Sequence, residues 1–156
     1  MRIRDILIKY LFVAVLGFIF HFAYDFFNVD FLKIIFPQNE SIFEHLKLII
    51  FPSLILMLLE LLLMNNRSYI FRSFISGIVV ACVFMITAYY TYSGIIGQNI
   101  DYVNIAIFFI SIMIVFYYRY KKITLFDSSN SVIAFIVLLL FIEIFTFYPG
   151  NIDFFK

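Results

Sequence analysis

Five long apolar segments, joined by short polar stretches, follow one another along this chain of 156 residues. They cover approximately residues 9–27, 46–64, 70–92, 103–118 and 132–148. Each approaches the ~20 residues with which an α-helix crosses ~30 Å of hydrocarbon. None alternates like a barrel strand, and only helices and closed barrels satisfy their backbones inside lipid. The sequence therefore predicts an all-α, polytopic membrane protein with five transmembrane helices.

The overall composition supports this class and excludes others. Hydrophobic residues make up 65% of the chain and charged residues 13%, whereas about a quarter of the residues in soluble domains are charged. We expect a single integral membrane domain over residues 1–156, with the lipid bilayer as its surroundings. A net charge of +1 is too small for a nucleic-acid-binding surface. The single cysteine, Cys82, allows neither an internal disulfide nor a thiolate metal cage.

Basic residues between the segments predict the orientation in the membrane. One side would carry eight of them: Arg2, Arg4, Lys9, Arg67, Arg72, Arg119, Lys121 and Lys122. The other side would carry three: Lys33, Lys47 and Lys156. Since basic residues concentrate in cytoplasmic loops, we expect a multi-pass protein of the cell membrane with a cytoplasmic N-terminus and an outer C-terminus.

The first connection, which would face outward, begins with an apolar stretch at residues 30–36. This stretch is too short to cross the membrane and too apolar to lie in water. We therefore expect a short interfacial helix that ends at Pro37.

A dense polar cluster follows directly, over residues 37–48. Ser41 and Glu44 have the spacing of a capping box, in which the serine hydroxyl and the glutamate carboxylate each accept a backbone amide. Cap formation does not require Asn39, Glu40 or His45. The sequence leaves open whether this motif is a helix cap or an active site.

Further polar residues are predicted to lie at the same side of the membrane. His21 and Asp25, four residues apart, have neighbouring side chains if the first segment is helical. We expect a polar pocket formed by His21, Asp25, Asn39, Glu40, Ser41, Glu44, His45 and Glu143. Its candidate metal ligands are His21, Asp25, Glu44 and His45, and two imidazoles with two carboxylates suit Zn²⁺, Mn²⁺ or Fe²⁺.

A metal with an open coordination position could activate water for hydrolysis of lipid or envelope material. The spacing matches no known zinc motif such as H-E-x-x-H, however. Two other functions therefore stay open. In a small transporter or proton-coupled binding protein, His21, Asp25 and the intramembrane carboxylates Glu60 and Glu143 would line a path across the membrane, because ionisable groups are costly in lipid. Five spans make a small transporter, so this function would need a homo-oligomer or a membrane partner protein. In a structural or accessory subunit without catalysis, the cluster would cap a helix and contact an external partner protein.

The string Pro-x-Asn-Glu-Ser-x-x-Glu-His-x-Lys-Leu at residues 37–48 resembles the signature of a family of uncharacterised five-span bacterial membrane proteins. Three shorter strings fit the same resemblance, at residues 21–25, 92–97 and 145–149. The resemblance implies a five-span architecture and no established activity.

Overall fold

Helices account for nearly all of the computed structural model, which describes residues 3–27 and 29–148. In order, the elements of this part of the chain are α1 (Ile3–Phe27), the 3-10 helix η1 (Asp30–Ile34), α2 (Ile42–His45), α3 (Lys47–Leu63), α4 (Arg67–Ile96), α5 (Asp101–Lys121) and α6 (Ser128–Phe147). The described residues contain no β-strand. The predicted all-α class is confirmed.

Five helical stretches in the described part of the chain are long and apolar enough to cross a membrane. The second of them begins at Ile42 rather than near residue 46, because α2 continues into α3 through Leu46, whose backbone is itself helical. The helix expected at residues 30–36 is the shorter η1. The predicted class of multi-pass membrane protein thus holds, with helix ends that differ by several residues.

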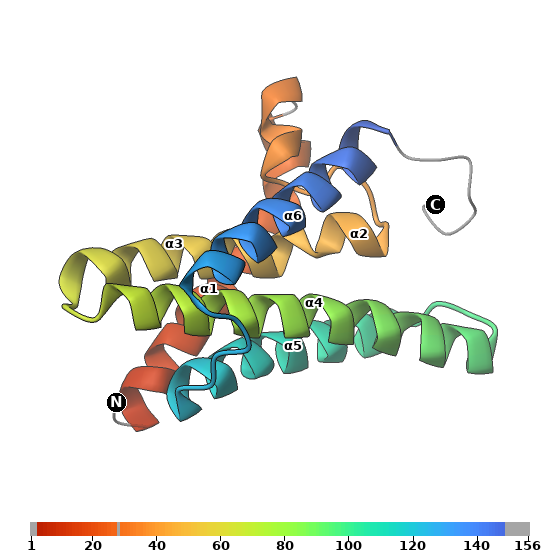
Figure 1. Ribbon diagram of the computed structural model, residues 1–156. Coiled ribbons are helices and arrows are strands. Elements are labelled where there is room, and N and C mark those ends of the chain that lie inside the picture. Colours follow the sequence, from red (N-terminus) through yellow and green to blue (C-terminus); the bar gives the residue numbers. More distant parts are fainter. Residues whose placement is uncertain (1–2, 28, 149–156) are drawn as a thin grey trace.

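α4 is the central helix of the bundle. It contacts α3, α5 and α6, whereas α1 packs against α3 and α5. Figure 1 shows α3, α4 and α5 running alongside one another, with α1 passing obliquely behind them and α6 crossing in front. In the most apolar window of each span, 56% of the residues of α4 are buried, against 17% for α6. α6 therefore turns most of its surface away from the protein, as expected for a helix in contact with lipid.

Two glycines allow close helix contacts. A Cβ atom at Gly77 of α4 would lie 3.0 Å from the Cα atom of Val115 in α5. One at Gly17 of α1 would lie 2.8 Å from the carbonyl oxygen of Leu48 in α3. This carbonyl lacks its usual amide partner four residues on, because residue 52 is proline. Small residues at such positions let membrane helices approach closely.

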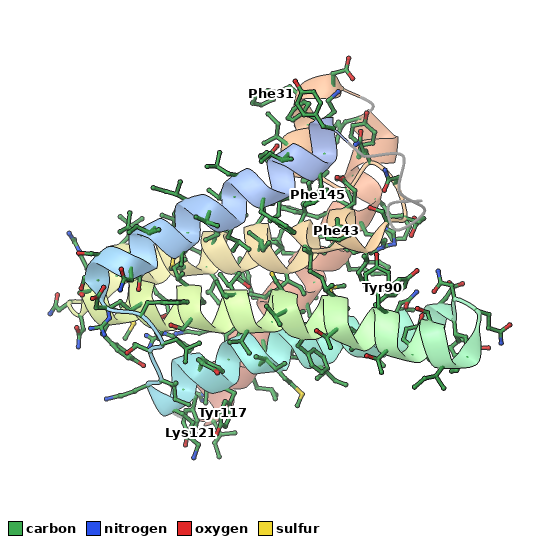
Figure 2. All side chains as sticks on the ribbon, turned by 45° about the vertical axis from the view of Figure 1, so that its right-hand side comes forward. Phe31, Phe43, Tyr90, Tyr117, Lys121 and Phe145 are labelled. Carbon is green, nitrogen blue, oxygen red and sulfur yellow. The ribbon has the colours of Figure 1, made fainter. Side chains whose placement is uncertain are left out.

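Stacked aromatic rings hold α2 against α6. The ring of Phe43 in α2 stacks on that of Phe145 in α6, with 4.9 Å between the centroids, and Figure 2 shows the two rings between these helices. This contact fixes α2, and hence the polar cluster, at the end of the bundle where α1 and α6 finish. We call it the histidine end, after His21 and His45. The opposite end, where α1 begins and α5 finishes, is the arginine end, after Arg119.

Candidate functional site

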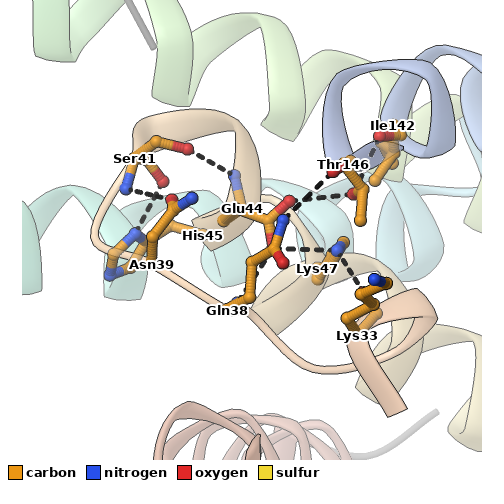
Figure 3. Close-up of polar contacts among 9 residues, drawn as sticks. All are labelled: Lys33, Gln38, Asn39, Ser41, Glu44, His45, Lys47, Ile142 and Thr146. Atoms are coloured by element: carbon orange, nitrogen blue, oxygen red, sulfur yellow. Dashed lines mark hydrogen bonds and ion pairs between the residues drawn. The ribbon is translucent and has the colours of Figure 1, made fainter. Parts of the chain in front are cut away.

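The first turn of α2 is capped by side chains, as Figure 3 shows. The hydroxyl of Ser41 accepts a hydrogen bond from the amide of Glu44, at 3.3 Å. The predicted return bond from the Glu44 carboxylate is replaced by another one, because the side-chain oxygen of Asn39 accepts the amide of Ser41, at 3.0 Å. Ser41 and Asn39 therefore both act in positioning α2, and the carboxylate of Glu44 is available for other contacts.

Glu44 lies in a buried polar network. Its Oε2 atom accepts hydrogen bonds from Lys47 Nζ at 2.9 Å and from the amide of Gln38 at 3.0 Å. Its Oε1 atom accepts the hydroxyl of Thr146, at 2.8 Å. Lys47, which is completely buried, also donates to the carbonyl oxygen of Lys33, at 2.6 Å. The network joins η1, the start of the second span and α6 (Figure 3).

The histidines lie on the other side of α2. His21, Glu40 and His45 each offer a ligand atom, and these three atoms lie within 4.8 Å of one another. His45 Nε2 is 3.3 Å from a carboxylate oxygen of Glu40, and the imidazole rings of His21 and His45 meet edge to face, with 5.2 Å between the centroids. The structure thus brings both predicted imidazoles together, with Glu40 beside them.

The orientation of the His45 ring is fixed by a backbone contact. Its Nδ1 atom lies 2.9 Å from the carbonyl oxygen of Ser41. A carbonyl only accepts, so Nδ1 carries a proton, and Nε2 is the ring nitrogen that lies 3.3 Å from the Glu40 carboxylate. Metal-binding histidines in proteins commonly have their second nitrogen held in this way.

The three groups differ in exposure. The side chain of His45 is 20% exposed and that of Glu40 is 81% exposed. Ligand atoms on one Zn²⁺ ion lie about 3.4 Å apart, given bonds of about 2.0–2.1 Å and tetrahedral geometry. Small side-chain rotations, above all of the exposed Glu40, would therefore bring the group onto a single ion.

The remaining predicted pocket residues lie elsewhere. Glu44 faces the buried network rather than the imidazoles. Asp25 belongs to α1 by its backbone, and its side chain lies outside the described residues. Glu143 lies one turn before Thr146 in α6, where the charges of Lys47 and Glu44 act on it, and its Oε2 atom is buried with no hydrogen-bond partner among the described residues.

Glu60 belongs to the arginine end. Its Oε1 atom accepts a hydrogen bond from Lys9 Nζ at 2.6 Å, and its Oε2 atom is bound by Nε and Nη2 of Arg119, at 2.9 and 2.7 Å. The guanidinium carbon of Arg119 also lies over the ring of Tyr69, 5.1 Å from its centroid. Glu60 is therefore an ion-paired group, far along the second span from His45.

Sequence reasoning missed the cations that neutralise the two buried carboxylates. Lys9 and Arg119 were interpreted only as markers of orientation, and Lys47 was counted as an outer loop residue. A physical signal was present, because a carboxylate inside a membrane protein needs a cation or a proton. Lys47 follows Glu44 by three residues, which is a helical pairing distance.

A sequence profile of a family of unknown function, DUF6512, matches residues 3–156 of the chain. The protein belongs to this family. No curated protein and no solved structure matches the chain. The resemblance to an uncharacterised family is thereby shown, whereas the bacterial origin and the Asn-Glu-Ser-x-x-Glu-His signature stay predictions. DUF6512 carries no assigned activity.

Proposed function

We propose that this DUF6512 protein binds a divalent metal ion through His21, Glu40 and His45, at the outer side of the cell membrane. The observation that carries the proposal is the His45 ring, whose Nδ1 is held by the carbonyl of Ser41 at 2.9 Å while Nε2 faces Glu40 at 3.3 Å. A neutral Nε2 and a carboxylate oxygen are both acceptors. A cation makes this contact attractive, and we propose a metal ion rather than the second proton of an imidazolium, because His21 offers a third ligand atom within 4.8 Å of the other two.

The donor set suits a borderline metal. Two imidazole nitrogens and one carboxylate oxygen are typical ligands of Zn²⁺, and Mn²⁺ and Fe²⁺ accept the same atoms. Three protein ligands leave a coordination position open for water, which is the composition of a catalytic rather than a structural zinc site. A metal lowers the pKa of such a water and makes it a nucleophile at neutral pH. We infer hydrolysis of a lipid or envelope substrate at this position.

The proposed outer location rests on the distribution of basic residues. Arg67, Arg119, Lys121 and Lys122 all lie at the arginine end. The positive-inside rule puts that end in the cytoplasm and the histidine end outside.

Metal content of the purified protein tests the proposal. The chain would be freed of metal with a chelator in detergent, equilibrated with Zn²⁺, and assayed for bound zinc by elemental analysis. We expect about one zinc per chain in the wild type. We also expect an affinity at least about tenfold lower in His21→Ala, Glu40→Ala and His45→Ala, since each removes one ligand.

Asp30→Ala is the matched control, because Asp30 is an exposed carboxylate of η1 whose side chain is 93% exposed. It should bind zinc like the wild type. Equal zinc binding by the wild type and His45→Ala would overturn the metal site. Full binding without metal-dependent release of product from envelope lipid extracts would overturn the hydrolytic step alone and leave a metal-binding accessory protein.

A proton-coupled function is the second candidate, and Glu143 is the observation that favours it. Its buried Oε2 atom has no partner in the described part of the chain, so the carboxyl group is suited to hold a proton. Glu60 fits such a path poorly because Lys9 and Arg119 already neutralise it. Proton-driven flux in proteoliposomes that is lost in Glu143→Gln would support this function, and flux unchanged by the substitution would exclude Glu143 as the carrier.

A further inference from the structure

A cleft of about 600 Å³ opens at the arginine end. It lies between the first turns of α1, the connection from α3 to α4 and the end of α5, and its lining includes Lys9, Arg119 and Lys122. The metal site at the histidine end contributes no residue to it. The cleft is therefore separate from the proposed metal site.

The charges around this cleft are unequal. Lys9 and Arg119 share the single carboxylate of Glu60, and both of its oxygens are already bound. One carboxylate cannot neutralise two cations, so this group of three keeps a net positive charge. Lys122 adds another cation, and the carboxylate in the lining, Asp5, also lies 3.9 Å from Arg4. Cations therefore exceed carboxylates in and around the cleft.

The start of α4 adds to the positive potential. Asn66, the residue before its first turn, lines the cleft and makes no side-chain capping bond to that turn. No acidic residue stands in the first turn of this 30-residue helix. The uncapped amides and the positive end of the helix dipole favour an anion at such a position.

A shallow, open apolar groove, lined by side chains of α1 alone, continues from the cleft along the surface of this helix. It has a volume of about 350 Å³ and extends from Ile8 to Ile19, past Leu11 and Val15. Ile8 lines both the cleft and the groove, which makes them neighbouring parts of one surface. At about 1.5 Å per residue the groove runs for about 16 Å along the helix axis.

We propose that this surface binds a phospholipid with an anionic headgroup. The phosphate lies against Lys9, Arg119 and Lys122 in the cleft, and one acyl chain lies in the groove along α1. A basic pocket between membrane helices is the kind of site that recognises anionic headgroups. The apolar groove adds the contact energy of the chain, which a free phosphate or another soluble anion lacks.

Lipid binding to the purified wild-type protein tests the proposal directly. The delipidated protein would be incubated in detergent with phosphatidylglycerol, with phosphatidylcholine of the same acyl chains, or with glycerol phosphate, and the complexes measured by native mass spectrometry. We expect one phosphatidylglycerol per chain, bound at least about fivefold more tightly than phosphatidylcholine. Glycerol phosphate should bind far more weakly, because it has no acyl chain.

Two substitutions separate the headgroup from the acyl chain. Lys122→Asn removes one cation at a position with φ 59°, which asparagine tolerates, and should weaken phosphatidylglycerol binding about fivefold with little effect on phosphatidylcholine. Val15→Trp fills the groove and should weaken binding of both lipids. Val137→Trp on α6 is the matched control, since Val137 and Val15 have similar exposures of 58% and 56%, and it should bind like the wild type.

Three results would overturn the proposal. Equal binding of the two lipids would remove the headgroup site, and equal binding of glycerol phosphate and phosphatidylglycerol would assign the cleft to a soluble anion. The absence of any retained lipid would remove the site altogether. All three are measured on the wild type, so a variant that fails to fold does not affect them.

Discussion

Lys47 is a lysine without exposed surface in a molecule that has few charges. Its ammonium group is neutralised by Glu44 and held by the carbonyl of Lys33, so that both charges of the pair are satisfied inside the bundle. Removing one member leaves the other charge buried and unpaired, which is costlier than removing both.

We predict that Glu44→Ala and Lys47→Met each lower the free energy of unfolding by about 3–5 kcal/mol. The double variant should lose less than the sum of the two, because no unpaired charge remains. Unfolding in mixed micelles, followed by circular dichroism, measures all three. The ion pair of Lys33 with the exposed carboxylate of Asp30 is the control, and Asp30→Ala should change stability by less than about 1 kcal/mol. Additive losses at Glu44 and Lys47 would contradict the pairing.

Residue spacing could have separated Glu44 from the histidines. Adjacent residues on a helix point about 100° apart, so Glu44 and His45 cannot face the same ligand from one turn. Glu40 lies before the cap and returns to His45 through the turn that Asn39 and Ser41 stabilise. The identity of the polar cluster was readable from the sequence. Which carboxylate lies beside the histidines could not be predicted, because the position of Glu40 depends on the path of the residues before α2.

At the scale of elements, the close approach of α1 to α3 depends on a single missing side chain. We predict that Gly17→Ala destabilises the protein by about 1–3 kcal/mol, because the new methyl group would lie 2.8 Å from the carbonyl oxygen of Leu48. Gly94→Ala is the matched control, since a Cβ atom there has no neighbour within 4 Å. It should be neutral, or stabilising by up to about 1 kcal/mol through helix propensity. Equal unfolding midpoints of the two variants would refute this contact.

The five spans were predictable because each forms one apolar run, and their ends were not, because a helix continues past the point where polarity begins. α5 includes Asp101 and Arg119 and ends at Lys121, and the next residue, Lys122, caps it with a left-handed backbone. α4 continues to Ile96 and is capped by Gly97, which also has positive φ. The start of the second span at Ile42, where α2 leads through Leu46 into α3, left no clear signal in the apolar pattern.

At the scale of the whole molecule, the distribution of basic residues predicts which end of the bundle faces the cytoplasm, and site-specific labelling tests this orientation. Cysteine substitutions at Asn65 and Gln98 address it, because both residues are exposed and they lie in connections at opposite ends of the bundle. The native Cys82 is buried and should stay unlabelled. In intact cells, an impermeant maleimide should label Gln98→Cys and not Asn65→Cys. The reverse pattern would place the histidine end in the cytoplasm and remove the proposed outer site.

The ion pairs of Glu60 at the arginine end could not be predicted from the sequence, because they join three different helices. The antiparallel order of the spans brings Lys9, Glu60 and Arg119 to one level, although they are far apart in the chain. Which of the cations at that level meets the carboxylate depends on how α1 crosses α3 and α5, and this follows from packing at positions such as Gly17. The order of the spans could be predicted from the sequence, but the way in which α1 crosses α3 and α5 could not.

The 30 residues of α4 make a rod of about 45 Å, well beyond the ~30 Å of hydrocarbon that a typical bilayer offers. Its partner α5 has 21 residues, close to a match. Tilting the pair or leaving the last turns of α4 among the lipid headgroups resolves the mismatch. Bilayer thickness therefore helps to set how deeply both ends of this protein sit.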